Sequence, residues 1–584
     1  MADRTVAEQM ITVLRQAGVR RVYGVVGDSL NPLVDAIRRS EGAIEWIHVR
    51  NEEAGAFAAA AEAETTGRLA VCAGSCGPGN THLIQGLYDA HRSRVPVLGL
   101  ASHIPSTQIG TDFFQETHPE RVFVDCSGYC EMVSTPGQLP RVLRTAVQHA
   151  LGAGGVSVVA FPGDVAALPV ARPTGVSTFL QPDQRATAVP AQAQVEALGE
   201  AINGARKPVL FAGAGVRGAH TEVMRLAETI QAPIGHSLRG KEWIQFDNPY
   251  DVGMSGLLGY GACHDALHEA DLVVLLGTDF PYDSFLPGSH TVQIDHDPTR
   301  FGRRTPLDLA VHGDVAATLR AVQPLLKPRQ DRSFLDDMLR RHGAALERVV
   351  GAYTKNIEHH TPIHPEYVAA ILDDVASDDA VFTVDTGMNN VWAARYLTPN
   401  GRRRVIGSFL HGSMANALPH AIGAQLAHPD RQVVALAGDG GLGMLMGELL
   451  TLKKYAKRAP VKVVVFNNGA LGMIKLEMMV SGYPEYEIDN GDVDYAAIAR
   501  ACGLHGVRVT RPTEVRAALA EALAAPGPAL VDVVTDPNAL SLPPTITAAQ
   551  LKGFALAAGR TVLDGGVGKM IDLARSNLRN IPRP

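Results

Sequence analysis

The chain has 584 residues, which is long enough for several domains. Its hydrophobic content of 46 % suits large cores, and 53 basic residues against 60 acidic ones give a formal charge of −7. This balance excludes a protein drawn to nucleic acid by its overall charge. The first residues do not read as a signal peptide, and no uncharged run of about 18 apolar residues predicts a membrane span, so we expect a cytoplasmic protein.

Short apolar runs alternate with helix-length segments along the whole chain, a βα alternation that predicts doubly wound parallel sheets. Two segments interrupt it: residues 169–190 are rich in Pro, Thr and Gln, and residues 327–362 predict a charged helix. The chain is thereby divided into three α/β units of roughly 150 to 190 residues, followed by a tail after residue 536. In chain order the predicted strands are 22–26, 69–73, 95–101, 156–161, 209–212, 272–276, 291–294, 380–384, 433–437, 461–466 and 529–534.

The six cysteines include two pairs with a C-x3-C spacing, Cys72 with Cys76 and Cys126 with Cys130. That spacing also occurs in metal sites, but Cys72 ends an apolar run typical of a buried strand, and no cluster of histidines completes a ligand set. We interpret the cysteines as reduced structural thiols, as in other cytoplasmic proteins.

Two polar motifs of the third unit each follow an apolar strand. One is the Gly-Asp-Gly triplet around Asp439, and the other is the pair Asn467-Asn468. Ligands of α/β proteins bind at the carboxyl ends of parallel strands, where an acid and an amide can share one Mg²⁺ and glycines let a phosphate approach the next helix. Asp439 and Asn468 are thus the predicted metal ligands. The same sequence pattern would also result if Asp439 were a helix N-cap or Asn467 a turn residue.

The spacing of these motifs resembles the diphosphate-anchoring motif of thiamine diphosphate (ThDP) enzymes. The resemblance adds the backbone carbonyl of Ala470 as a third metal ligand, and it implies that both turns contact ThDP. The residues it implies are Asp439, Gly440, Gly441, Asn468, Gly469, Ala470, Leu471, Gly472, Met473 and Ile474.

Residues 411–419 are similar to the segment with which this family grips the aminopyrimidine ring of ThDP. The Gly412 carbonyl would accept a hydrogen bond from the 4′-amino group, with Ser413 beside it. Met414 would wedge between the two rings of the cofactor and keep it bent. Without the resemblance, a methionine just before a helix would be interpreted as an ordinary core residue.

Glu52 opens an Ala-rich helix and matches the family glutamate whose carboxyl group contacts pyrimidine N1′ and so promotes loss of the C2 proton. A buried carboxyl group suits such proton sharing. From the residues alone Glu52 could equally be a partner of the helix dipole, and Glu53 is the adjacent alternative. Close relatives usually carry His before this Glu, and Asn51 stands there instead, which leaves the local hydrogen bonding open.

Nearly the whole chain resembles the bacterial quinone-dependent pyruvate dehydrogenases, also called pyruvate oxidases, which are flavin-containing ThDP enzymes. The resemblance implies a pyrimidine-binding domain (1–180), a central FAD domain (181–345), a diphosphate- and Mg²⁺-binding domain (346–536) and a C-terminal tail (537–584). It also implies a homotetramer built as a dimer of dimers, with each active site between two subunits. The segments that carry it are 24–31, 71–80, 114–119, 239–242, 248–254 and 277–282.

For FAD, the resemblance implies two loops of the central domain and Asp295, which follows strand 291–294 at a place suited to a carboxylate on ribose hydroxyls. A turn-forming Asp would look the same. The Gly-x-Gly-x-x-Gly pattern at 213–218 lacks an acid about 20 residues later, so it supports a dinucleotide only weakly. The implied FAD residues are Ser255, Gly256, Leu257, Leu258, Thr278, Asp279, Phe280, Pro281, Tyr282 and Asp295.

On the substrate side, relatives often carry Phe where Met473 stands, which puts details of the pocket in doubt. Glu477 could assist proton handling or be a plain surface acid on a helix. The catalytic and substrate-side residues that the resemblance implies are Asp28, Ser29, Glu52, Phe114, Gln115, Gly412, Met414, Ile474 and Glu477.

Residues 567–579 predict an amphipathic helix, and from residue 559 onward five basic residues face only two acidic ones. A helix lying on anionic lipid and a helix packed on the protein body would look alike. The resemblance favours a segment that reaches the inner face of the cell membrane. The predicted apolar side consists of Val567, Met570, Ile571, Ala574 and Leu578.

The function implied is oxidative decarboxylation of pyruvate to acetate and CO₂ with ThDP, Mg²⁺ and FAD, the electrons passing to a membrane quinone. Two alternatives keep the cofactors: an oxygen-dependent oxidase that forms acetyl phosphate, and an acetolactate synthase-like carboligase. A third alternative is a catalytically silent partner protein with this fold, against which the presence of Glu52, Asp439 and Asn468 argues.

Overall fold

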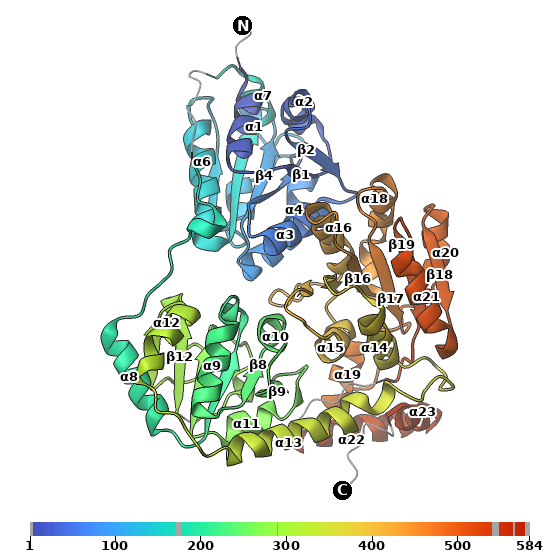
Figure 1. Cartoon of the computed structure of the whole chain (residues 1–584). Coiled ribbons are helices and arrows are strands. Elements are labelled where there is room, and N and C mark those ends of the chain that lie inside the picture. Colours follow the sequence, from blue (N-terminus) through green and yellow to red (C-terminus); the bar gives the residue numbers. More distant parts are fainter. Residues whose placement is uncertain (1–3, 171–177, 289, 540–547, 564–566, 578–584) are drawn as a thin grey trace.

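Three α/β domains follow one another along the chain, each built around one sheet, and the described part of the tail forms two further helices (Figure 1). The predicted doubly wound architecture is confirmed. Every predicted strand is found, with ends that differ from the prediction by one or two residues at most. The computed structural model describes residues 4–170, 178–288, 290–539, 548–563 and 567–577.

The N-terminal domain has a parallel sheet with the order β2-β1-β3-β4-β6-β5. The order reverses between β1 and β3, which is where open α/β sheets bind ligands. The strands are β1 (Arg21–Gly24), β2 (Glu45–His48), β3 (Ala70–Gly74), β4 (Val97–His103), β5 (Tyr129–Met132) and β6 (Val156–Pro162). The main helices are α1 (Val6–Gln16), α2 (Asn31–Arg39), α3 (Glu52–Thr66), α4 (Pro78–Ser93) and α6 (Leu139–His149).

The C-terminal domain repeats this topology. Its parallel order, β15-β14-β16-β17-β19-β18, equals that of the first sheet when strands are counted from the start of each domain. The strands are β14 (Val381–Val384), β15 (Arg404–Gly407), β16 (Val433–Gly438), β17 (Lys462–Asn467), β18 (His505–Val509) and β19 (Ala529–Val534). The main helices are α14 (Pro365–Val375), α15 (Met388–Tyr396), α16 (Ala417–Ala427), α17 (Asp439–Met444), α18 (Leu449–Lys454), α19 (Gly472–Val480), α20 (Tyr495–Ala501) and α21 (Pro512–Ala524).

The central sheet, ordered β10-β9-β8-β7-β11-β12-β13, departs from the expected parallel pattern at one edge, where β10 pairs antiparallel with β9. Gly253 and Gly261 have φ values of +91° and +80°, and glycine adopts such values at little cost, so this short hairpin forms easily. The strands are β7 (Pro208–Ala212), β8 (Ile234–His236), β9 (Asp251–Met254), β10 (Tyr260–Gly261), β11 (Leu272–Leu276), β12 (Thr291–Asp295) and β13 (Leu309–His312). The main helices are α8 (Gln192–Gly204), α9 (His220–Ile230), α10 (Leu238–Ile244), α11 (Cys263–Glu269) and α12 (Val315–Val322), and α13 (Ser333–Arg348) forms the predicted charged helix.

The Ala-rich helix α3 joins the first and third domains. It packs between α4 of its own domain and α16 of the C-terminal domain, so alanines on all its sides are buried. A Cβ atom at Gly423 of α16 would collide with the carbonyl of Ala58, and one at Gly86 of α4 would collide with Ala56. The small residues therefore let the three helix backbones approach closely, which fixes the start of α3 relative to both domains.

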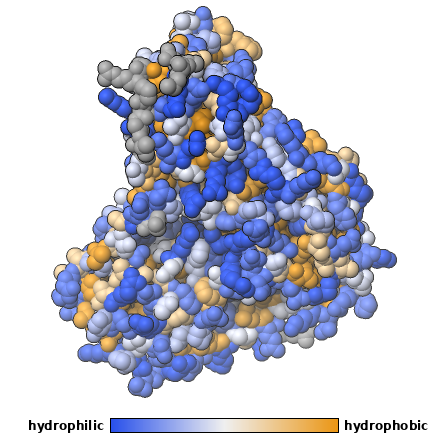
Figure 2. All heavy atoms as spheres, turned by 45° about the horizontal axis from the view of Figure 1, so that its top comes forward, coloured by the Kyte–Doolittle hydropathy of each residue, from blue (hydrophilic) through white to orange (hydrophobic). Residues whose placement is uncertain are grey.

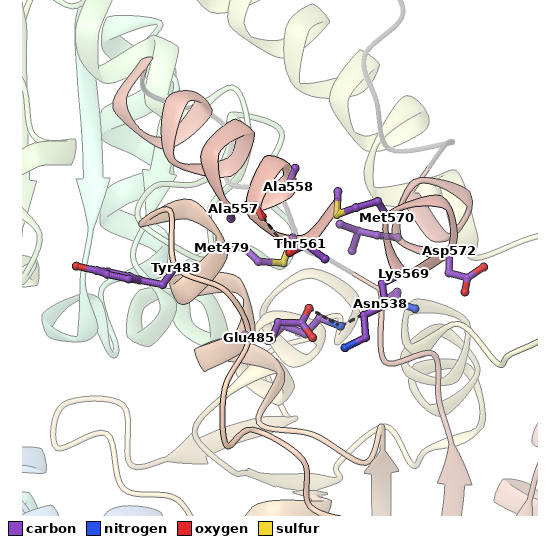
Figure 3. A pocket seen from close by; sticks show the side chains of 12 residues that line it. Met479, Tyr483, Glu485, Asn538, Ala557, Ala558, Thr561, Lys569, Met570 and Asp572 are labelled. Atoms are coloured by element: carbon purple, nitrogen blue, oxygen red, sulfur yellow. Dashed lines mark hydrogen bonds and ion pairs between the residues drawn. The ribbon is translucent and has the colours of Figure 1, made fainter. Parts of the chain in front are cut away.

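The tail helices α22 (Ala548–Leu563) and α23 (Val567–Asn577) pack beside α19. Between the three helices lies a cavity of about 220 Å³, which Lys475 also lines. Figure 3 shows Glu485 and Asn538 among its polar residues. Lys475 Nζ donates to Asn538 Oδ1 at 3.0 Å and pairs with Glu485 at 3.3 Å. The tail is thus docked through a buried lysine as well as through apolar contacts.

The inward side of α23 overlaps only in part with the predicted apolar side, of which Met570 packs against Met479 and Leu573. Leu573, Ser576 and Asn577 are buried, whereas Ile571 is 47 % exposed and Ala574 is also exposed. Ser576 Oγ donates to Asp536 Oδ2 at 2.6 Å, a contact between polar groups that hydrophobic periodicity cannot reveal. Leu578 lies outside the described residues.

In the described ranges, no helix is both long and apolar enough to cross a bilayer. On the face shown in Figure 2, hydrophobic residues are scattered among hydrophilic ones.

Candidate active site

Asp439 and Asn468 lie at the ends of neighbouring strands, as predicted. Strand β16 ends just before Asp439, β17 ends just before Asn468, and the two strands pair in parallel. Asp439 begins helix α17 and is only 3 % exposed, and burial raises the pKa of its carboxyl group. Asn490 connects the two turns, because its side chain donates to Asp439 Oδ2 at 3.1 Å and its backbone donates to the Gly469 carbonyl at 2.8 Å.

The space around these turns is tight and favours glycine. A Cβ atom at Gly440 would lie 3.0 Å from Leu471 Cδ2 and 3.2 Å from Met414 Cε, and Gly469 has a φ of +66°. The groups available to a metal are hard oxygens, which suit Mg²⁺. Within the described residues no group of three or more His, Cys, Asp or Glu side chains can hold a metal, so phosphate and water oxygens would have to complete the coordination. The turns therefore fit a diphosphate-bound Mg²⁺.

Met414 reaches the same place from a third segment. Its neighbours Gly412 and Ala415 have φ values of +79° and +66°, so the loop turns sharply on both sides of it. Ser413 is held by its backbone N–H, which donates to Ser408 Oγ at 3.0 Å, and by its hydroxyl, which accepts from Gln85 Nε2 at 2.9 Å. The predicted pyrimidine segment and the predicted diphosphate turn thus converge at Met414 and Gly440.

Asp385, which follows β14, was not predicted from the sequence. Its buried carboxylate accepts the Ala417 N–H at 2.9 Å and the Gly438 N–H at 3.3 Å. A Cβ atom at Gly441 would collide with Asp385 Oδ2. Burial raises the pKa of Asp385 to about 6. This carboxylate therefore connects the end of the pyrimidine segment to the diphosphate turn. A single Asp in a sequence gives no sign of such a role.

Glu52 is the first residue of α3 and is 7 % exposed. Its Oε2 lies 3.0 Å from His82 Nδ1, and a Cβ atom at Gly79 would be 3.0 Å from its Oε1. Asn51 caps the helix, since its side chain accepts the Glu53 N–H at 2.9 Å. Burial raises the pKa of Glu53. Asn51 therefore serves the helix start and leaves Glu52 directed toward α4.

Ser29 and Gln115 are both connected to Cys76, at the reversal point of the N-terminal sheet. Ser29 Oγ lies 2.9 Å from Ser75 Oγ and 2.7 Å from Ser102 Oγ, and it accepts the Cys76 N–H at 3.1 Å. The Cys76 thiol donates to Gln115 Oε1 at 3.4 Å. Cys76 was not among the site residues predicted from the sequence.

Two further substrate-side candidates lie on exposed surface. Phe114, next to Gln115, is 78 % exposed. Glu477 is exposed on α19, close enough to the central domain to raise the pKa of Tyr282, an effect second to burial of the phenol. Helix α19, which also carries Ile474, therefore approaches the predicted FAD segment 278–282.

The predicted FAD residues of the central domain include buried polar atoms that lack protein partners. Ser255 Oγ, Asp279 Oδ1 and Asp295 Oδ2 are buried, and none has a hydrogen-bond partner among the described residues. Ser255 and Asp279 follow β9 and β11, and Asp295 ends β12, so all three lie at the carboxyl ends of parallel strands. Unpaired buried polar groups are costly, so hydroxyl and amide groups of a ligand such as FAD fit this end of the sheet.

The glycine pattern at 213–218 has a packing role in this domain. Gly215 N donates to the Gly277 carbonyl at 2.9 Å, and Cβ atoms at Gly213 or Gly215 would approach Gly277 within 2.6 Å. The first two glycines therefore let the ends of β7 and β11 touch. This explains the pattern without a phosphate.

Comparisons with known proteins agree with this geometry. Three family descriptions match in order: the N-terminal TPP binding domain of thiamine pyrophosphate enzymes over residues 4–122, their central domain over 195–322, and their C-terminal TPP binding domain over 385–533, TPP being another name for ThDP. The chain belongs to the thiamine pyrophosphate enzyme family.

Three relatives extend over almost the whole chain. A putative thiamine pyrophosphate-containing protein YdaP of Bacillus subtilis is 36 % identical over 566 residues, 95 % of this chain and 96 % of the relative. A pyruvate oxidase of Lactiplantibacillus plantarum is 32 % identical over 537 residues, 90 % and 87 % of the two chains. An acetolactate synthase large subunit of Parasynechococcus marenigrum is 34 % identical over 553 residues, again 90 % and 87 %.

Proposed function

We propose that this protein oxidatively decarboxylates pyruvate to acetate and CO₂ with ThDP, Mg²⁺ and FAD, and that a membrane quinone takes the electrons. The observation that carries the proposal is the convergence of Met414, Gly440 and the Asn468 turn at one sheet edge. Similarity to a pyruvate oxidase supports the substrate and the flavin. When bound, ThDP supplies an electron sink for the loss of CO₂, and FAD accepts two electrons.

The residues of the chain would hold the cofactor at both ends. Asp439, Asn468 and the Ala470 carbonyl would bind Mg²⁺, and the glycine turns would receive the diphosphate. The Gly412 carbonyl would accept a hydrogen bond from the pyrimidine amino group. Glu52 would share a proton with pyrimidine N1′, and because it is buried, water would not compete for that hydrogen bond.

The active site is proposed to lie between two subunits of a homotetramer. Glu52 of one subunit would face residues 412–414 of its partner, and the exposed Phe114 and the nearby Gln115 would border the pyruvate pocket. Ile474 and Glu477 of α19 would close the pocket toward the flavin, in keeping with the position of Glu477 near Tyr282. Ser29 would support the pocket from behind, since its hydroxyl already has three hydrogen-bonding neighbours.

The test is anaerobic mixing of the purified holoenzyme with pyruvate and with other 2-keto acids while the flavin absorbance is followed. Bleaching by pyruvate, with acetate formed in the presence of a dye and without phosphate, is the expected result. If acetyl phosphate and peroxide formed instead, the protein would be an oxygen-dependent oxidase and the proposal would be refuted. If acetolactate formed without net flavin reduction, the protein would be a carboligase. The similarity to acetolactate synthases makes this the second candidate function. No turnover at all would indicate a silent partner protein.

The tail is proposed to bring the enzyme to the inner face of the cell membrane. Ile571 and Ala574 of the predicted apolar side are exposed rather than packed, so they are available to a lipid surface. Deletion of the residues after 558 should abolish sedimentation with anionic liposomes and spare pyruvate turnover with a soluble acceptor. Liposome binding that survives the deletion would refute the membrane role.

A further inference from the structure

The segment that leads into Glu52 is held by the C-terminal domain of the same chain. Strand β2 lies at the edge of its sheet, so the chain beyond it has no neighbouring strand on one side. The His48 N–H donates to Tyr455 Oη at 2.8 Å. The N–H groups of Arg50 and Asn51 both donate to Glu448 Oε1, at 2.8 and 3.1 Å. Three backbone amides just before Glu52 therefore have acceptors from another domain.

Glu448 is built into this position. It is 1 % exposed, and its second oxygen accepts the Thr451 hydroxyl at 2.6 Å. Its carboxylate therefore receives three hydrogen bonds, which compensate for the cost of burying it. It also sits at the N-terminus of α3, where a negative charge is favourable.

An apolar cluster supports the same turn. Val49, Ala54 and Phe57 pack with Leu445, which lies between Asp439 and Glu448 in the chain, and with Ala415, the neighbour of Met414. The turn of Glu52 thus packs on residues of its own C-terminal domain that lie beside Met414 and beyond the Asp439 turn in the chain, and Glu448 supplies its polar attachment.

We propose that Glu448 is a positioning residue, which fixes the turn 48–51 and thereby holds the Glu52 carboxyl where it can share a proton with ThDP. What Glu52 does there rests on the proposed function. The placement of the turn by Glu448 does not, because it follows from the hydrogen bonds of the chain itself.

The test compares Glu448→Ala with Glu448→Gln and with Thr451→Val. The Gln side chain can still accept both backbone N–H groups through its oxygen and can donate its NH₂ to the Thr451 hydroxyl, so it should behave like the wild type. The Thr451→Val change removes only the hydroxyl contact and leaves both backbone hydrogen bonds. The Ala variant leaves two amides without acceptors.

Two measurements are made on each variant. The first is the distance from Glu52 Oε2 to His82 Nδ1 in a crystal structure of each cofactor-free variant. In the wild-type chain this distance is 3.0 Å. The second is the rate at which the C2 proton of bound ThDP exchanges with deuterium in the holoenzyme, at saturating cofactor. Displacing a catalytic group by about 1 Å can cost on the order of 100-fold in rate, so the Ala variant should lose this contact and exchange at least about tenfold more slowly.

The outcomes separate the two claims. An Ala variant with Glu52 in place and normal exchange would overturn the inference, as would a Gln variant as impaired as the Ala variant. An equal loss of thermal stability in all three variants, with exchange per bound cofactor unchanged, would also overturn it by showing a merely structural role. If Glu52→Gln itself exchanged like the wild type, the proposed role of Glu52 would fail, while the crystal structures would still decide what Glu448 positions.

Discussion

Replacing Asp385 by Ala should loosen the cofactor turns at their common attachment. The change leaves the N–H groups of Ala417 and Gly438 buried without an acceptor, at about 1–3 kcal/mol each, so about 2–6 kcal/mol in all. In a domain of 150–250 residues 1 kcal/mol corresponds to roughly 2–4 °C, so the cofactor-free protein should melt at least about 4 °C lower. ThDP titrations should show weaker binding. Asp378→Ala is the control, because its carboxylate makes an exposed ion pair with Arg402.

The same carboxylate predicts a pH dependence. Burial raises the pKa of Asp385 from 3.8 to about 6, so between these values the folded chain binds more protons at this site than the unfolded chain. Stability from this group is therefore present at low pH and is lost as the pH rises from about 4 to 6. The melting temperature of the wild type should therefore fall relative to that of Asp385→Asn as the pH rises across this range, since the Asn variant has no proton to lose. Parallel melting curves, or an Ala variant that melts and binds ThDP like the wild type, would refute this role of Asp385.

Three further changes test other parts of the site. Asp439→Asn should raise the Mg²⁺ concentration needed for ThDP binding by about tenfold or more, and an unchanged requirement would contradict the predicted ligand. Gly440→Ala should weaken ThDP binding, because its Cβ would crowd Leu471 and Met414 beside the predicted cofactor turns, and unchanged binding would contradict this role of the turn. Lys475→Met should make the tail more sensitive to limited proteolysis, because the contacts to Glu485 and Asn538 are lost, whereas Lys569→Met, at an exposed lysine, should not.

The fold was readable from the sequence because buried parallel strands are continuous apolar runs, which stand out between helices. In the described part of the chain, eight strands, each of two to five residues, were not predicted: β2, β5, β8, β9, β10, β13, β15 and β18. Strand β10 is the shortest of them, and Tyr260-Gly261 is too short to show a period. The equal strand order of the first and third domains could not be predicted either, because the same sheet topology can be built from different amino acids. The hydrophobic pattern did not reveal that Ser576 and Asn577 face the protein body, because both are buried through hydrogen bonds.

The candidate site divides in the same way. Asp439 and Asn468 could be proposed as ligands because each directly follows the end of a predicted strand, whereas Met414 was singled out only through the family resemblance. Asp385 and Glu448 could not be predicted, since each acts by accepting backbone N–H groups from segments that are distant in the chain. Any acid of the right length would give the same sequence signal, and only the tertiary fold shows which one is surrounded by donors.

The most direct test of the account mixes two inactive chains, Glu52→Gln and Asp439→Ala, and measures pyruvate oxidation after the subunits have been exchanged. If Glu52 of one chain and Asp439 of its partner serve one cofactor, each mixed dimer contains one site with both native residues, so random mixing should restore about a quarter of the wild-type activity. Activity that stays at the level of the separate variants would contradict the shared site.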